Sequence, residues 1–210
     1  MTDAIATLIA TYPELKVCQQ SLYQTLETLI ETYQQRGKIL ICGNGGSAAD
    51  CEHIVGELMK GFISQRPLPE SVRQQFQQMF PEEGEYLADH LQGALPAISL
   101  VSHSALISAF ANDVSAEIVY AQQVYGYGLP QDTLLAISTS GNSANVVRAV
   151  QVAKVMKLNT IGLTGQGGGK LSELCDVTIK VPKKLTHQIQ ELHLPVYHAL
   201  CIGLENEFFS

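Results

Sequence analysis

Two short segments of this sequence combine glycine and hydroxyl residues in a pattern that is suited to binding anions. The first covers residues 43–47 (GNGGS), and the second covers residues 138–143 (STSGNS). Each follows a short apolar run and precedes a stretch with helical periodicity. Unpaired backbone N–H groups at a helix N-terminus attract phosphate, and hydroxyl groups add further donors. Both segments are therefore predicted to be strand-to-helix turns that hold an anion.

The glycine turn also matches a dinucleotide fingerprint, GxGxxA, at residues 43–48. That site needs an acidic residue about 20 positions later, at the end of the second strand. Here the second apolar run begins only near Pro96, and no Gly-Lys-Ser/Thr of a P-loop follows the turn. We expect the turn to hold a sugar or a phosphate through backbone N–H groups, Asn44 and Ser47. The alternative is a tight turn that needs glycine only for its backbone.

The second segment carries four hydroxyl groups within six residues. Ser143 alone would serve as a helix N-cap, but that role leaves Ser138, Thr139 and Ser140 without an explanation. Loops that follow adjacent parallel strands open at the same carboxyl edge of a sheet, where ligands of open α/β sheets bind. Both segments are therefore expected to line one pocket.

His53 and Glu57 lie four residues apart, on one face of the helix predicted after the glycine turn. Imidazole and carboxylate are both good zinc ligands, although a simple His–Glu surface contact has the same spacing. Near the C-terminus, a mostly apolar helical stretch carries Gln190 and His198, which need polar partners or a metal if they are buried. A hydrogen-bonded core histidine is the alternative for His198.

The remaining sequence alternates strand-like and helix-like stretches. Strands are predicted at residues 38–42, 96–101, 133–138, 159–164 and 177–181. Helices are predicted at residues 2–36, 47–62, 102–111, 115–126, 143–156 and 187–208. Strands that are apolar on both faces and alternate with helices are typical of an α/β protein, with a parallel sheet covered on both sides.

Residues 64–94 interrupt this alternation with a polar, proline-containing insertion. Val72, Phe76 and Phe80 recur at intervals of four, which predicts an amphipathic helix in part of it. The insertion is expected either to pack against the body or an oligomer partner, or to act as an active-site lid.

Composition narrows the function classes. The chain has 210 residues and a formal net charge of −7, which argues against a broad nucleic-acid-binding surface. No apolar run is long enough to span a membrane, and the first residues lack the basic region of a signal peptide. Five scattered cysteines fit buried thiols in a reducing compartment, so a cytoplasmic protein is expected. A catalytic cysteine is the alternative for any one of them.

Taken together, the motifs CGNGGS…HxxxE, STSGNSANV, LTGxxGG and IQExHxxxxH resemble, in this order, the sugar isomerase (SIS) domain family of the phosphoheptose isomerase type. The resemblance spans nearly the whole chain except the insertion. It implies one SIS domain over residues 1–210, built as a three-layer sandwich with a five-stranded parallel sheet and long N- and C-terminal helices. It also implies a homotetramer with its sites at subunit interfaces.

The resemblance further implies a set of site residues and one Zn²⁺ per subunit. The zinc ligands would be His53, Glu57, Gln190 and His198. The substrate contacts would be Asn44, Gly45, Gly46, Glu57, Asn112, Asp113, Ser138, Thr139, Ser140, Ser143 and Gln190.

The implied reaction is an aldose–ketose isomerisation of a phosphosugar, sedoheptulose 7-phosphate to D-glycero-D-manno-heptose 7-phosphate, through an enediol. Glu57 and His198 would be its general base and acid, with the assignment of each proton left open. The alternatives are another ketose phosphate as substrate, a non-catalytic scaffold like the replication-initiator-associating factor, and a sugar-phosphate sensor. Glu57 and His198 favour an enzyme, and no room remains for the DNA-binding domain that such a sensor carries.

Four positions depart from the pattern common among these isomerases. His187 stands three residues before Gln190, where an acidic residue is common, and Gly61 stands four residues after Glu57, where Arg is common. Ala48 takes a position where His is frequent. Pro195 is expected to remove a hydrogen bond from the last helix and to favour a kink there. These changes leave the predicted metal ligands intact and bear on the choice of sugar.

Overall fold

Five parallel strands form the centre of the protein. The computed structural model describes residues 3–209 and orders the strands β2-β1-β3-β4-β5. Their bounds are Ile39–Cys42 (β1), Ala97–Ser99 (β2), Thr133–Ile137 (β3), Asn159–Thr164 (β4) and Val177–Lys180 (β5). Leu40 in β1 lies opposite Ile98 in β2 and Leu134 in β3. The predicted α/β class with a five-stranded parallel sheet is confirmed.

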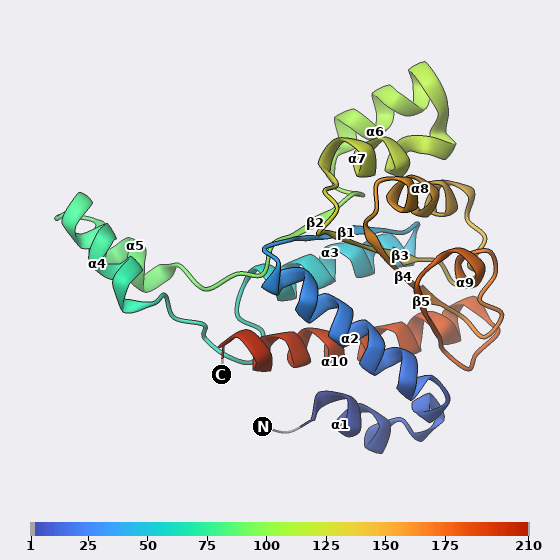
Figure 1. Ribbon diagram of the computed structural model, residues 1–210, viewed down its shortest axis with the longest axis horizontal. Coiled ribbons are helices and arrows are strands. Elements are labelled where there is room, and N and C mark those ends of the chain that lie inside the picture. The colour runs from blue at the N-terminus through green and yellow to red at the C-terminus, as the bar shows by residue number, and fades with distance from the viewer. Residues whose placement is uncertain (1–2, 210) are drawn as a thin grey trace.

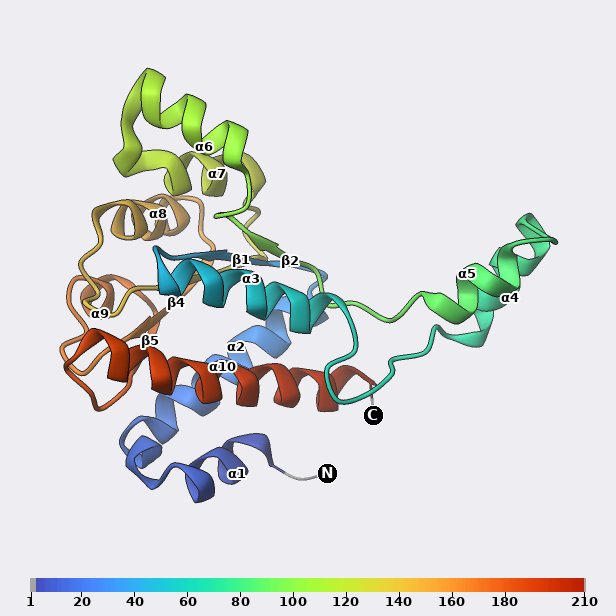
Figure 2. The ribbon, with the colours of Figure 1, turned by 180° about the vertical axis from the view of Figure 1, so that it is seen from behind.

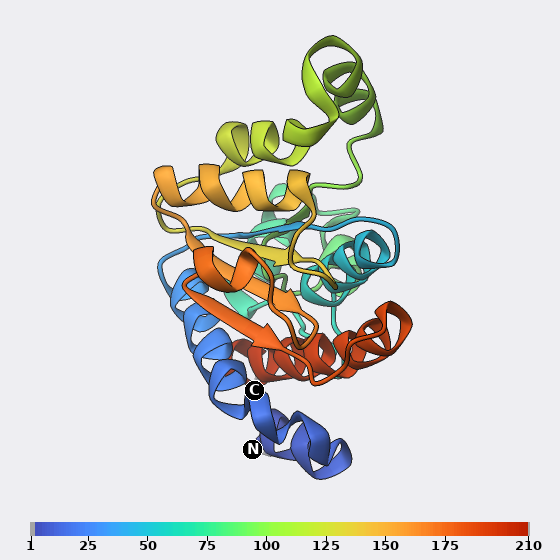
Figure 3. The same ribbon diagram turned by 90° about the vertical axis from the view of Figure 1, so that its right-hand side faces the viewer.

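Alternate residues of each strand enter different hydrophobic cores, because successive side chains of a strand point to opposite faces. Ile39 and Ile41 join the core beneath α1 (Ala4–Thr11), α2 (Gln19–Gln34), α3 (Gly46–Met59) and α10 (Thr186–Phe209). Leu40 and Cys42 join the core beneath α7 (Val119–Tyr127), α8 (Ala144–Val155) and α9 (Leu171–Leu174). Figure 3 shows these three layers, with α8 in orange on one side and α10 in red on the other.

The N-terminal region is not the single helix predicted for residues 2–36. Helix α1 ends at Thr11, a 3₁₀ helix covers Pro13–Cys18, and α2 follows. A proline disfavours the α conformation of the residue before it, and Tyr12 is indeed non-helical (φ −124°, ψ 76°). Residue 2 lies outside the described range.

The last helix, α10, spans Thr186–Phe209 and continues through Pro195, so the expected kink does not end or divide it. It packs against α1, α2 and α3. Because α10 lies beside α3, it places Gln190 and His198 near the helix that carries His53 and Glu57.

The insertion forms two helices, α4 (Glu70–Met79) and α5 (Gly84–His90), which pack against each other. Figures 1 and 2 show this pair as an arm that projects from the body on two extended connections. The connections meet at the base of the arm, where Pro67 bridges Gln92 and the Gly93 N–H donates to the Arg66 carbonyl (2.8 Å). No residue of α4 is buried.

Between β2 and α7 the chain forms α6 (Ser104–Phe110), a π-helical turn (Ala111–Ser115) and a short 3₁₀ helix (Ala116–Ile118). The predicted helices at 102–111 and 115–126 therefore occur with shifted bounds. All five cysteines are free thiols. Within residues 3–209, no helix combines the length and apolar character needed to cross a bilayer.

Candidate active site

The glycine turn joins β1 to α3 with a backbone that suits glycine. Gly45 has a positive φ of 57°, a conformation that residues with a Cβ rarely adopt. The Ser47 N–H donates to the Asn44 carbonyl (3.0 Å), and the Tyr120 hydroxyl donates to the Gly43 carbonyl (2.7 Å). These bonds fix the turn from both sides, and α3 begins at Gly46.

The glycine turn and the serine-rich turn lie side by side, as expected for loops after the adjacent strands β1 and β3. Asn44 and Asn145 connect them through two reciprocal amide hydrogen bonds of 2.8 and 2.9 Å. Within the serine-rich turn, the hydroxyls of Ser138 and Ser143 are 3.0 Å apart and bonded. The Asn44–Asn145 pair therefore fixes the N-terminus of α3 relative to the N-terminus of α8.

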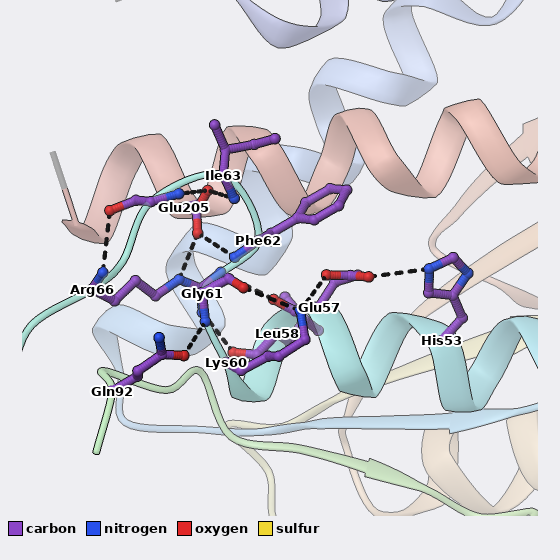
Figure 4. A network of polar contacts seen from close by, with 11 residues as sticks. His53, Glu57, Leu58, Lys60, Gly61, Phe62, Ile63, Arg66, Gln92 and Glu205 are labelled. Carbon is purple, nitrogen blue, oxygen red and sulfur yellow. Dashed lines mark hydrogen bonds and ion pairs between the residues drawn. The ribbon is translucent and has the colours of Figure 1, made fainter. Parts of the chain in front are cut away.

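His53 and Glu57 contact each other on α3, and α10 brings His198 beside them. His53 Nε2 is 3.1 Å from Glu57 Oε1, and Lys60 Nζ is 3.2 Å from Glu57 Oε2 (Figure 4). The rings of His53 and His198 pack edge to face, with centroids 5.1 Å apart. Glu57 is only 9% exposed, so its carboxylate has limited contact with water.

His198 has the character of a neutral imidazole in a sheltered place. Its Nε2 atom is buried and has no hydrogen-bond partner within the part of the chain that the structure describes. Burial, followed by the nearby His53, lowers the pKa of His198, while Glu57 acts in the opposite direction. A neutral ring at pH 7 leaves one ring nitrogen with a lone pair that is free for a proton, a substrate hydroxyl or a metal.

The predicted zinc ligands fit a metal by donor type. Two imidazoles, a carboxylate and an amide oxygen are all ligands that zinc accepts, and the unpartnered His198 nitrogen is the clearest opening for a cation. Across residues 3–209, no three His, Cys, Asp or Glu side chains are already grouped as a metal site. His53 and Glu57 instead bond to each other, so zinc stays a prediction.

Gln190 lies at the glycine turn. A Cβ added at Gly46 would lie only 2.3 Å from Gln190 Nε2, so the amide packs directly on this glycine. Gln190, near the start of α10, therefore joins this helix to the glycine turn. This contact gives the sequence GlyGly at residues 45–46 a packing role beside its turn role.

The other predicted substrate residues are divided between different places. Thr139 and Ser140 line a cavity of about 410 Å³ together with Lys183 and Lys184. His198 lines another cavity, of about 500 Å³, between α1 and α10. Asn112 and Asp113 lie exposed on the π-helical turn, where the Asn112 amide donates to Asp113 (2.8 Å). Among residues 3–209, no hydrogen bond joins this pair to the two turns or to His198.

Comparison with known proteins places this arrangement in a family. The SIS domain profile matches residues 73–165. The phosphoheptose isomerase of Rhodospirillum rubrum is 36% identical over 193 residues, covering 92% of this chain and 89% of that protein. That of Helicobacter pylori is 38% identical over 194 residues, covering 92% and 88%. The chain belongs to the phosphoheptose isomerase family. A solved structure of phosphoheptose isomerase GmhA from Neisseria gonorrhoeae matches with a TM-score of 0.75 at 32% identity, covering 96% of this chain and 94% of that one.

The predicted family resemblance is thus confirmed, and the structure explains one of its departures. A Cβ at Gly61 would lie 2.2 Å from the Ser64 carbonyl oxygen, so the backbone here leaves no room for an arginine side chain. Its neighbour Lys60 instead supplies the cation that contacts Glu57.

A buried ion pair that sequence reasoning missed supports the site. Arg66 is fully buried and donates to Glu205 Oε1 (2.7 Å), to the Leu58 carbonyl (2.8 Å) and to the Glu57 carbonyl (3.0 Å). Figure 4 shows how these bonds tie the end of α3 to α10. Because the last carbonyls of a helix lack partners within the helix, Arg66 caps α3 at the residue that carries the candidate carboxylate.

The Glu205 carboxylate also accepts the backbone N–H groups of Phe62, Ile63 and Ser64, at 2.8 to 3.1 Å. Burial acts to raise the pKa of Glu205, but these N–H groups and Arg66 outweigh it and hold the pKa below its usual range. The carboxylate is therefore charged at neutral pH. In the sequence, Glu205 is one of several polar residues near the end of the last helix, and nothing local signals such a role.

Proposed function

We propose that the protein is an aldose–ketose isomerase that interconverts sedoheptulose 7-phosphate and D-glycero-D-manno-heptose 7-phosphate. The observation that carries the proposal is the sheltered carboxylate of Glu57 next to two imidazoles, in a chain of the phosphoheptose isomerase family. Proton transfer between neighbouring carbons needs a base of this kind within reach of a carbonyl compound, and a scaffold does not.

In this proposal Glu57 removes the proton from the carbon beside the carbonyl and returns it to the neighbouring carbon, through an enediol. The neutral ring of His198 exchanges a proton with the sugar oxygens. Lys60 Nζ lies 3.2 Å from this carboxylate, on the side away from His53. Positioned acid–base groups of this kind contribute roughly 10²- to 10⁴-fold in rate.

The two turns at the sheet edge would bind the other end of the substrate. The hydroxyls of Ser138, Thr139, Ser140 and Ser143 and the first N–H groups of α8 are donors suited to a phosphate. Asn44, Gly45 and Gly46 would contact the sugar, with Gln190 beside them. Asn112 and Asp113 complete the proposed set, and a second subunit of the proposed homotetramer would bring them to the site.

One zinc ion per subunit, held by His53, Glu57, Gln190 and His198, belongs to the proposal. When bound, such an ion would polarise the carbonyl and stabilise the developing oxyanion. The support is the donor set and the unpartnered nitrogen of His198. Elemental analysis of protein purified with zinc supplementation tests it, with His198→Ala as the variant that should lose the metal.

A screen of ketose phosphates with five to seven carbons, followed by NMR with and without zinc, tests the function itself. We expect conversion of sedoheptulose 7-phosphate to an aldose phosphate, faster than conversion of the shorter sugars. Turnover of a shorter ketose phosphate alone would correct the substrate. Absence of turnover with all of them, in folded protein supplied with zinc, would refute the isomerase proposal and favour a scaffold.

A further inference from the structure

The cavity of about 410 Å³ beside the serine-rich turn carries two lysines in addition to hydroxyl groups of that turn. Its lining includes Thr139 and Ser140 from the turn, and Lys183 and Lys184 from the segment between β5 and α10. No acidic side chain of the described residues lines it. The cavity therefore combines hydroxyl donors with two positive charges and no opposing carboxylate.

Backbone hydrogen bonds join the three loops that build this cavity at the carboxyl edge of the sheet. The Gly165 N–H, which follows β4, donates to the Thr139 carbonyl, which follows β3 (3.0 Å). The Gln166 N–H donates to the Lys183 carbonyl, which follows β5 (3.0 Å). The backbone of the lysine segment is therefore fixed relative to the serine-rich turn.

The charges of the two lysines are largely uncompensated. Lys183 Nζ is 3.9 Å from Glu14 Oε1, a long ion pair between partly exposed side chains. Lys184 is exposed and forms no ion pair within residues 3–209. Residues 177–190 contain no acidic residue, although the whole chain has a formal net charge of −7. A local excess of positive charge of this kind attracts anions to this edge of the sheet.

A phosphate monoester needs more than the neutral donors of the serine-rich turn. Its charge at neutral pH is close to −2. Hydroxyl and backbone N–H groups donate hydrogen bonds but carry no formal charge. Lysine binds phosphate as a point charge with three rotatable donors. Two lysines beside the turn therefore match the charge of one phosphate group.

A second cavity near the turn is less suited to an anion. It has a volume of about 340 Å³, and its lining includes Asn142, Arg148, Lys170 and Glu173. Glu173 brings a negative charge into this cavity, and Arg148 already forms an ion pair with Glu117 (2.6 Å). The cavity with the lysine pair has no such carboxylate and is the better place for a phosphate.

We propose that Lys183 and Lys184 bind the phosphate group of the substrate, together with the hydroxyls of Thr139 and Ser140, as specificity-determining residues. This inference rests on the proposed function, because it assigns further residues to the same phosphosugar.

The position of the cavity on α10 predicts an effect on binding rather than on proton transfer. Ile189 lines the cavity, and the next residue, Gln190, packs on Gly46 of the glycine turn. The cavity therefore adjoins the predicted sugar contacts. His198 follows Ile189 by nine positions on α10, which corresponds to about 13 Å along the helix axis. The lysines are thus well separated from the candidate acid–base groups.

Steady-state kinetics with sedoheptulose 7-phosphate give the first test. Lys183→Gln and Lys184→Gln are each expected to raise KM about 3- to 10-fold, and the double variant about 10- to 100-fold. The kcat should stay within about twofold of the wild type, because lost ground-state binding changes KM alone. Replacing both lysines by arginine keeps the charges and should restore most of the affinity.

Lys157→Gln is the matched control, because Lys157 is exposed between α8 and β4, at the opposite edge of the sheet. Its KM should equal that of the wild type. The urea unfolding midpoint of every variant should stay near the wild-type value. A fall in kcat with an unchanged KM in the double variant would overturn the inference. A larger rise in KM for Lys170→Gln than for the double variant would place the phosphate in the other cavity and overturn it as well.

Binding of inorganic phosphate, measured by isothermal titration calorimetry without any sugar, separates this inference from the isomerase proposal. We expect the wild type to bind phosphate more tightly than the Lys183→Gln/Lys184→Gln variant, and added potassium chloride to weaken the wild type more. Equal binding by the two proteins, or no binding by the wild type, would overturn the inference whatever the turnover assays show. Weaker binding by the variant, in a protein that converts no ketose phosphate, would support the lysine site and refute only the isomerase proposal.

Discussion

Replacing Arg66 with alanine tests how the site is supported. The guanidinium is fully buried and has three hydrogen-bond partners, Glu205, the Leu58 carbonyl and the Glu57 carbonyl. It also stacks on the ring of Phe209, at 4.6 Å from the ring centroid. The substitution would leave a buried carboxylate without its cation and two helix carbonyls without donors.

The expected loss of stability is large. Removing one partner of a buried ion pair costs about 3–5 kcal/mol, because the other charge stays buried. The orphaned carbonyls add roughly 1 kcal/mol each. Glu205 keeps its three backbone donors, which limits the total. We therefore expect the free energy of unfolding to fall by about 5 kcal/mol, a large part of the roughly 5–15 kcal/mol of a typical protein.

Urea unfolding followed by circular dichroism, at one fixed protein concentration, measures this loss. Arg66→Lys is the milder variant, because lysine keeps the positive charge but lacks the planar guanidinium that donates to all three partners. Arg73→Ala is the control, since Arg73 forms its ion pair with Asp89 on the exposed arm and should change the midpoint little. A fall of less than about 1 kcal/mol for Arg66→Ala would refute the reasoning that this pair supports the site.

Three further outcomes follow from the same geometry. The pKa of Glu205 is lower in the folded protein than in the unfolded chain. The stability that its charge contributes is therefore fully present above the unfolded pKa and is lost as pH falls through the folded pKa. Acid unfolding of Glu205→Gln should show a weaker pH dependence than that of the wild type. Gly141→Ala should destabilise the protein by about 1–3 kcal/mol and lower its thermal midpoint, because φ at Gly141 is 67° and a Cβ would lie 1.9 Å from the Gly168 carbonyl oxygen. Gly126→Ala, where a Cβ would meet open space, is the control and should not lower the midpoint. Replacing residues 68–91 by two glycines should leave the unfolding midpoint of the body nearly unchanged, because α4 buries no residue. The far-UV circular dichroism signal should fall only by the contribution of the deleted helices. A truncated protein that no longer folds would show that the arm is needed for folding.

Much of the sheet was readable from local pattern. Short, largely apolar runs became β1 and β3, since a strand buried on both faces has no polar alternation. The helix bounds were less accurate where a single residue decided them. Pro13 stops α1 from continuing into the next helical segment, and the spacing of the apolar residues does not indicate this break.

The site was readable only in part, for a different reason. Residues of one motif, such as His53 and Glu57, can be recognised from their spacing on one helix. Arg66 and Glu205 are 139 positions apart and meet only through the fold. Tyr197 belongs to no predicted motif, yet its hydroxyl lies between His53 Nδ1 and Asp50 Oδ1 in the structure.

The insertion illustrates the limit of amphipathic spacing. The spacing of Val72, Phe76 and Phe80 predicted an amphipathic helix, and α4 does form there and packs on α5, but that pair stands away from the body. Periodicity reports that a helix has an apolar face. It does not report whether that face meets the same domain or a neighbouring element.

The rate of sedoheptulose 7-phosphate isomerisation by Glu57→Gln tests the central claim most directly. Glu52→Gln, on the same helix with an exposed side chain bonded to Ser102, is the matched control. Circular dichroism and light scattering verify that both variants fold and assemble like the wild type. The account predicts at least a 100-fold loss of rate for Glu57→Gln and a wild-type rate for Glu52→Gln. A wild-type rate for Glu57→Gln would contradict the assignment of Glu57 as the base.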